Sequence, residues 1–122
     1  MAEVNMNGVA AQIIELPRKF HTLGNVSFSS LLRATSYFEV YDQISEAEIR
    51  EALARCPENI QKWMQYSEDK RTSGWYIIEN NKRYEVGCVA EDGDRKKQVQ
   101  YKNQIDACAS FIKREIEDLR SL

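Results

Sequence analysis

The sequence predicts an α+β fold: a three-stranded antiparallel meander packed against a C-terminal helix, with two to three N-terminal helices before the sheet. Residues 103–120 have the clearest helical periodicity, residues 74–102 contain three strand-like runs separated by turn residues, and residues 27–70 contain helix caps and helically spaced apolar residues. A chain of 122 residues fits one domain. We therefore expect a single domain over residues 1–122, in which the type of the segment 1–26 stays open.

The N-terminal segment is compatible with either a strand or a short helix. The run "GVAAQIIEL" is apolar enough for both, and Pro17 ends it in either case. Residues 21–25, "HTLGN", are then expected to form a loop.

A short helix is predicted after this loop. Leu31 and Leu32 lie on its apolar side, and Ser27 or Ser29 can cap its N-terminus. Residues 37–41, "YFEVY", have a strand-like composition. We therefore expect the chain to leave this helix in an extended conformation.

Two consecutive helices are predicted in the middle of the chain. The first starts with a capping box, in which Ser45 and Glu48 each bind the other's backbone N–H. Pro57 cannot continue that helix, but it suits the first turn of the next one. The predicted apolar faces consist of Ile49, Ala52, Leu53 and Cys56 in the first helix and of Ile60, Trp63, Met64 and Ser67 in the second.

Three strands and a final helix are predicted in the rest of the chain. The strands are "WYIIE", "RYEVGCVA" and "KKQVQYK", and "NNK" and "EDGD" are the turns between them. Gly87 lies alone inside the second strand, which indicates a β-bulge or close packing. The apolar stripe of the final helix consists of Ile105, Cys108, Ala109, Ile112, Ile116 and Leu119.

The composition excludes several classes of protein. Apolar residues make up 43% of the chain, charged residues 30%, and the net charge is −2, which is typical neither of a nucleic-acid-binding protein nor of a disordered one. The N-terminus lacks the pattern of a secretory signal, and no run approaches the ~20 apolar residues of a membrane-spanning helix. We therefore expect a cytoplasmic protein that makes no membrane contact.

The sequence contains no catalytic motif. Cys56, Cys88 and Cys108 match neither a disulfide framework nor a zinc pattern, so we expect free thiols. His21 is the single histidine, and its sequence neighbours include no acid or nucleophile. A Cys–His pair brought together by the fold is an open alternative. We predict no enzymatic activity, no cofactor, no metal and no small-molecule substrate.

The run "DRKKQVQYK" supports an alternative function in nucleic-acid binding. Arg95, Lys96 and Lys97 can follow a phosphate backbone while Tyr101 stacks on a base. The acidic turn "EDGD" precedes this run and weakens its field, and lysines also commonly protect an exposed edge strand. The charge balance therefore argues against nucleic acid as the main partner.

Residues 39–58 are acidic: six carboxylates less two arginines give a net charge of −4. Acids near a helix N-terminus complement its dipole. Glu46 and Arg50 also form a favourable i,i+4 pair, as do Glu51 and Arg55. The functional interpretation is an acidic face that docks a basic partner.

The aromatic residues are either core or contact residues. Trp63 has a core position in its predicted helix, and Trp75 and Tyr76 must point to opposite faces of their strand. One of the last two is therefore expected to face outward, where an aromatic ring can anchor a partner.

Four segments of the chain form a recognisable set: "SFSSLLRATSYFEVYDQISEAEIREAL", "YSEDKRTSGWYI", "YEVG" and "ACASFIKREI". Together they resemble small immunity proteins of bacterial polymorphic toxin systems, of the contact-dependent growth inhibition or Rhs type. The resemblance covers about residues 27–120. It implies a non-enzymatic cytoplasmic protein that binds one cognate toxin domain, often a nuclease, and blocks its active site or substrate path. The motif residues are Ser67, Glu68, Asp69, Lys70, Arg71, Gly74, Trp75 and Tyr76.

The predicted partner surface has two parts. The first choice is the acidic region, with Glu39, Asp42, Glu46, Glu51 and Glu58, and the second choice is the exposed part of "SEDKRTSGWY", with Glu68, Asp69, Arg71 and Tyr76.

Overall fold

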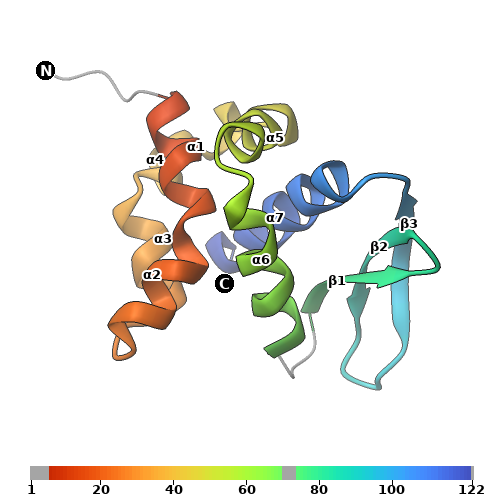
Figure 1. Ribbon diagram of the computed structural model, residues 1–122. Helices are drawn as coiled ribbons and strands as arrows, with labels where there is room; N and C mark the ends of the chain where they lie inside the picture. Colours follow the sequence, from red (N-terminus) through yellow and green to blue (C-terminus); the bar gives the residue numbers. More distant parts are fainter. Residues whose placement is uncertain (1–5, 70–73, 122) are drawn as a thin grey trace, which may run out of the picture.

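Six α-helices and one 3₁₀ turn precede the sheet in the computed structural model, which describes residues 6–69 and 74–121 (Figure 1). They are α1 (Met6–Ile14), α2 (Leu16–Leu23), α3 (Phe28–Ala34), α4 (Tyr37–Val40), η1 (Tyr41–Gln43), α5 (Glu46–Arg55) and α6 (Glu58–Asp69). The strands β1 (Gly74–Asn80), β2 (Arg83–Val89) and β3 (Arg95–Tyr101) and the helix α7 (Gln104–Arg120) follow. The α+β class and the meander against a C-terminal helix are confirmed, but the expectation of two to three N-terminal helices is wrong.

Pro17 is one reason for the additional helices. It does not end a segment but lies in the first turn of α2, where its missing N–H costs no intrahelical hydrogen bond. The expected loop at residues 21–25 is correspondingly wrong in its first half, because α2 continues to Leu23. Gly24 ends the helix with φ +74°, and its N–H donates to the carbonyl oxygen of Phe20 at 3.1 Å.

The segment "YFEVY" is the second reason. Ser27 caps α3, as predicted, by accepting a hydrogen bond from the N–H of Ser30 at 3.0 Å. The expected extended exit is wrong, because residues 37–43 form α4 and η1. Tyr37 and Val40 are both buried, and three-residue spacing puts both on one side of a helix but on opposite faces of a strand. Burial of both side chains therefore overrides the strand propensity.

The two middle helices are confirmed. The Oγ of Ser45 accepts from the N–H of Glu48 at 3.3 Å. Within the described residues the reciprocal half of the capping box is not formed, and Oε2 of Glu48 lies buried without a hydrogen-bond partner. In α6, Ile60, Trp63 and Ser67 are buried and Met64 is half-buried, as the apolar spacing predicts.

The helix α7 is the centre of the fold. It contacts α3, α5 and α6 on one side and all three strands on the other (Figure 1). Six consecutive residues, 107–112, are buried, so this part of the helix is covered all round and not only along one stripe. Of the predicted stripe, Cys108, Ala109, Ile112 and Ile116 are buried, and Ile105 and Leu119 are half-buried.

Trp63 joins the N-terminal helices to this centre. Its side chain is fully buried, and its indole N–H donates to the carbonyl oxygen of Ile14 at 3.0 Å. Its ring packs edge-on against those of Phe28, Tyr66 and Phe111, with centroids 5.5–6.1 Å apart. The core assignment of Trp63 is confirmed.

The sheet is an antiparallel meander in the order β1-β2-β3. Asn81 and Lys82 connect β1 to β2 with φ angles of +54° and +63°, as a two-residue type I′ turn requires. The pairing of β2 with β3 is irregular around Gly87, as its position in the strand predicts. A Cβ atom at Gly87 would lie 2.6 Å from the hydroxyl oxygen of Tyr76, so any side chain at this position would displace that ring.

Ser67 joins α6 to the outer edge of β1. Its Oγ accepts from the N–H of Ile77 at 2.9 Å and donates to the carbonyl oxygen of the same residue at 3.2 Å. One buried hydroxyl thus satisfies both backbone groups that an edge strand would otherwise expose at this position. The "YSEDKR" motif therefore has at least one residue whose role is structural.

Replacement of the two tryptophans should affect stability unequally. Trp63→Ala is expected to lower the free energy of unfolding by about 3–5 kcal/mol, because it leaves a cavity among three aromatic rings. Trp75→Ala should cost less, about 1–3 kcal/mol, because this side chain is only half-buried. Urea denaturation of both variants measures the difference. A larger loss for Trp75→Ala would contradict the packing described above.

Candidate functional site

The five carboxylates of the first predicted surface are all exposed. They come from four consecutive elements, α4, η1, α5 and α6, and we call them the acidic group: Glu39, Asp42, Glu46, Glu51 and Glu58. Two of them, Glu46 and Glu58, lie in the first turns of α5 and α6, where the helix dipole favours a negative charge. Helix stability therefore explains part of their placement.

Local ion pairs do not explain the rest. The side chain of Arg50 pairs with Asp106 of α7 and not with Glu46, so the predicted Glu46–Arg50 pair is wrong. Glu51 and Arg55 are also not within ion-pair distance. Within residues 6–69 and 74–121, no member of the acidic group has an ion-pair partner. These charges are therefore available to another molecule.

A largely exposed ion pair between Arg50 and Asp106 links α5 to α7. The hydrogen bond from Arg50, together with a smaller effect of the Asn103 side chain, lowers the pKa of the Asp106 carboxyl below its usual value. This interaction joins residues 56 positions apart in the sequence. It removes the one arginine in the acidic region that could have neutralised Glu46.

Lys113 of α7 borders the acidic group on one side. Its ammonium group donates to the hydroxyl oxygen of Tyr37 at 2.8 Å and to the carbonyl oxygen of Tyr41 at 2.9 Å. Burial lowers the pKa of Lys113, while the charges of Glu117, Asp42 and Glu46 act in the opposite direction. Lys113 is therefore one of the α7 cations that border the acidic group.

The second predicted surface is only partly accessible. Glu68 and Asp69 are exposed at the end of α6, and Oδ1 of Asp69 accepts from the side-chain amide of Gln65 at 3.0 Å. Arg71 lies outside the described residues. Tyr76 is 8% exposed, so it offers a partner little surface.

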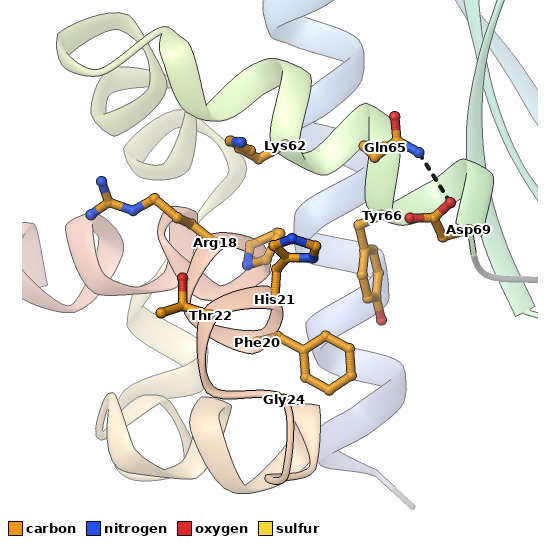
Figure 2. A pocket seen from close by; sticks show the side chains of 10 residues that line it. Arg18, Phe20, His21, Thr22, Gly24, Lys62, Gln65, Tyr66 and Asp69 are labelled. Atoms are coloured by element: carbon orange, nitrogen blue, oxygen red, sulfur yellow. Dashed lines mark hydrogen bonds between the residues drawn. The ribbon is translucent and has the colours of Figure 1, made fainter.

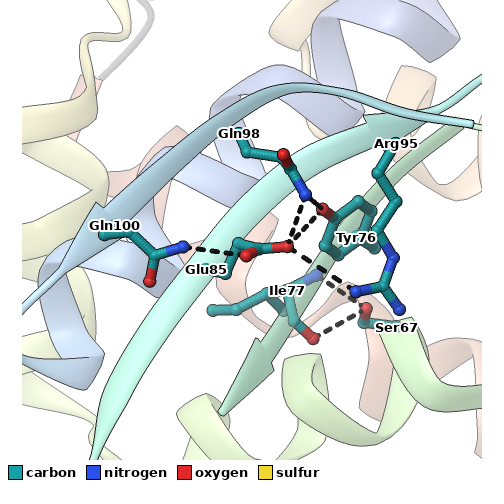
Figure 3. A network of polar contacts seen from close by, with 7 residues as sticks. All are labelled: Ser67, Tyr76, Ile77, Glu85, Arg95, Gln98 and Gln100. Atoms are coloured by element: carbon teal, nitrogen blue, oxygen red, sulfur yellow. Dashed lines mark hydrogen bonds and ion pairs between the residues drawn. The ribbon is translucent and has the colours of Figure 1, made fainter. Parts of the chain in front are cut away.

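Tyr76 instead belongs to a polar network on the sheet face opposite the core (Figure 3). The carboxylate of Glu85 accepts from the hydroxyl of Tyr76 at 2.5 Å and from the amides of Gln100 at 2.8 Å and Gln98 at 3.2 Å. Arg95 lies 3.8 Å from the same carboxylate. Burial raises the pKa of Tyr76, and the hydrogen bond from Tyr76 lowers the pKa of Glu85.

Sequence reasoning missed this network. The only signal was the charged residue in "YEVGCV", where Glu85 is flanked by apolar and aromatic residues. Its partners lie 9 to 15 positions away along the chain, and only the register of the meander brings them to it.

The basic strand is exposed but partly engaged within the protein. All residues of β3 from Arg95 to Gln100 are exposed. The guanidinium of Arg95 lies 5.2 Å from the centre of the Tyr76 ring. The hydroxyl of Tyr101 donates to Ser110 of α7 at 2.8 Å, so this ring packs on the helix and is not a free stacking platform. The ammonium of Lys97 lies 6.0 Å from the centre of the Trp75 ring, so three of the groups proposed for nucleic-acid binding already have contacts within the protein.

The structure shows no nucleophile paired with a base in the described part of the chain. His21 is exposed on α2 and makes no hydrogen bond to a described thiol. Cys108 is buried, which raises its pKa to about 12 and favours the unreactive thiol. The described ranges also contain no group of three or more side chains placed to hold a metal ion.

A groove of about 650 Å³ between α2 and α6 was not predicted. Phe20, His21, Lys62 and Tyr66 are among the residues that line it (Figure 2). It was missed because residues 21–23 were expected to be a loop, and only a continued α2 places this side of the helix opposite α6.

Comparison of the chain with protein-family models, with curated proteins and with solved structures found no match. The resemblance to immunity proteins thus stays a prediction from sequence. No helix among residues 6–69 and 74–121 has the length and hydropathy needed to cross a bilayer.

Substitution of Tyr76 by Phe tests the Glu85 network. The change should lower the free energy of unfolding by about 1–2 kcal/mol, because a buried carboxylate loses a hydrogen bond. In the parent protein the pKa of Glu85 is lower in the folded state than in the unfolded state. The ionised Glu85 carboxylate therefore stabilises the fold above the unfolded-state pKa, and this stabilisation is lost as the pH falls through the folded-state pKa. Tyr76→Phe should therefore also raise the pKa of Glu85, which an NMR titration measures. An unchanged Glu85 pKa would contradict the assignment.

Proposed function

We propose that this protein binds a basic protein partner and neutralises it by covering its functional surface. The immunity proteins that the sequence resembles act in this way on a cognate toxin domain. The observation that carries the proposal is the acidic group, five exposed carboxylates without an ion-pair partner among the described residues. Arg50, which lies next to Glu51 and four residues after Glu46, is held by Asp106.

Occlusion is the mechanism that this surface supports. Carboxylates of the acidic group take the place of substrate phosphates opposite lysines and arginines of the partner, and complementary charge speeds the encounter. The protein's own side chains perform no bond-making or bond-breaking step. A nuclease is a suitable partner because its substrate site is basic.

Nucleic-acid binding by β3 is the alternative. Its support is the exposure of Lys96 and Lys97, and its weakness is that Arg95, Lys97 and Tyr101 all have contacts within the protein. Binding of single-stranded RNA that weakens steeply with salt would favour this alternative.

The proposed function is tested by co-expression with the protein encoded immediately upstream. The two proteins should co-purify, and this chain should restore growth to cells that express the neighbour. Failure of both would refute the proposal.

A pair of matched variants locates the contact. Glu51→Gln/Glu58→Gln removes two charges from the acidic group, and Glu91→Gln/Asp94→Asn removes two exposed charges from the β2–β3 turn. The first variant should weaken binding roughly tenfold at low salt, mainly through slower association, and the second should have little effect. Equal effects of the two variants would show that net charge, and not this surface, determines binding.

A further inference from the structure

The groove between α2 and α6 has the size and the lining of a ligand site. Its volume of about 650 Å³ falls in the range of small-molecule pockets. Figure 2 shows the imidazole of His21 projecting from α2 towards α6, with the rings of Tyr66 and Phe20 beside it. Aromatic and polar groups from two helices thus converge on one hollow.

The aromatic side of the groove is held in place by the core. Phe20 is 38% exposed, and its ring packs edge-on against that of Phe28 at 5.6 Å. The ring of Phe28 in turn stacks on that of Tyr66 at 4.6 Å. The hydroxyl of Tyr66 donates to Glu115 of α7 at 2.6 Å. A ligand ring would therefore meet preformed aromatic surfaces and would not have to order them.

The charges of the groove are separated along α6. Lys62 and Asp69 are seven residues apart, which corresponds to about 10 Å of helix. Arg18 is paired with Glu15 at 2.6 Å, and Asp69 accepts from Gln65. Lys62 is exposed, and in the described residues it has neither an ion pair nor a hydrogen bond. An anion can therefore approach Lys62 without displacing a carboxylate.

We propose that this groove binds a small anionic aromatic molecule. Its ring lies between Phe20, His21 and Tyr66, and its anionic group meets the ammonium of Lys62. The aromatic contacts supply apolar burial, and the single charge contact fixes the orientation of the ligand. The proposal does not depend on the protein-binding function, because no member of the acidic group lines this groove.

Two fluorescent probes test the site: 8-anilinonaphthalene-1-sulfonate, which is anionic, and N-phenyl-1-naphthylamine, which has the same ring system without the sulfonate. The full-length protein should bind the anionic probe saturably at one site. Lys62→Gln should weaken that binding roughly tenfold and leave the neutral probe unchanged, because only the charge contact is lost. The matched control, Lys82→Gln in the exposed β1–β2 turn, should alter neither affinity.

A second variant tests the aromatic part. Phe20→Ala should weaken both probes, with near-UV circular dichroism unchanged to exclude binding to a loosened core. Non-saturable binding of the anionic probe to the parent protein would overturn the proposal. Equal responses of Lys62→Gln and Lys82→Gln would overturn it as well.

Discussion

The burial of α7 on all sides is the constraint on which the rest of the structure depends. The apolar face of the three-stranded sheet must be covered, and the N-terminal helices need an apolar surface to pack on. Residues 107–112 provide both surfaces at once, because their side chains point in every direction around the helix. Small residues, Ala107, Cys108, Ala109 and Ser110, let neighbours approach closely on all sides, while Phe111 and Ile112 fill the space between the layers.

Three side-chain contacts then link neighbouring elements of the fold. Trp63 holds α6 against α1, Ser67 holds α6 against the edge of β1, and Arg50 holds α5 against α7. The last contact has a functional consequence, because an arginine used for packing cannot neutralise its acidic neighbours. The charge of the exposed helical surface is therefore coupled to the way in which the helices are held together. The groove between α2 and α6 arises similarly, from the continuation of α2 beyond Pro17.

The parts of the fold predicted from sequence are those determined by local chemistry. The cap of α5 by Ser45, the turn at Asn81 and Lys82, and the periodicity of α7 depend on residues close in the chain. The errors occur where distant packing decides. "YFEVY" is helical because Tyr37 and Val40 share one buried side, and Arg50 turns to a carboxylate 56 positions away. The five residues of the acidic group are exposed, and their role as a partner surface stays a prediction, whereas the Glu85 network and the groove required the tertiary structure.

Hydrogen–deuterium exchange of the native protein tests the central position of α7 most directly. If this helix is covered on both sides, the backbone amides of residues 108–112 should exchange only through global unfolding, with protection equal to the free energy of unfolding from denaturation. The amides of α2 and β3, which lie at the periphery, should exchange faster through local opening. Faster exchange in residues 108–112 than in α2 or β3 would contradict the account.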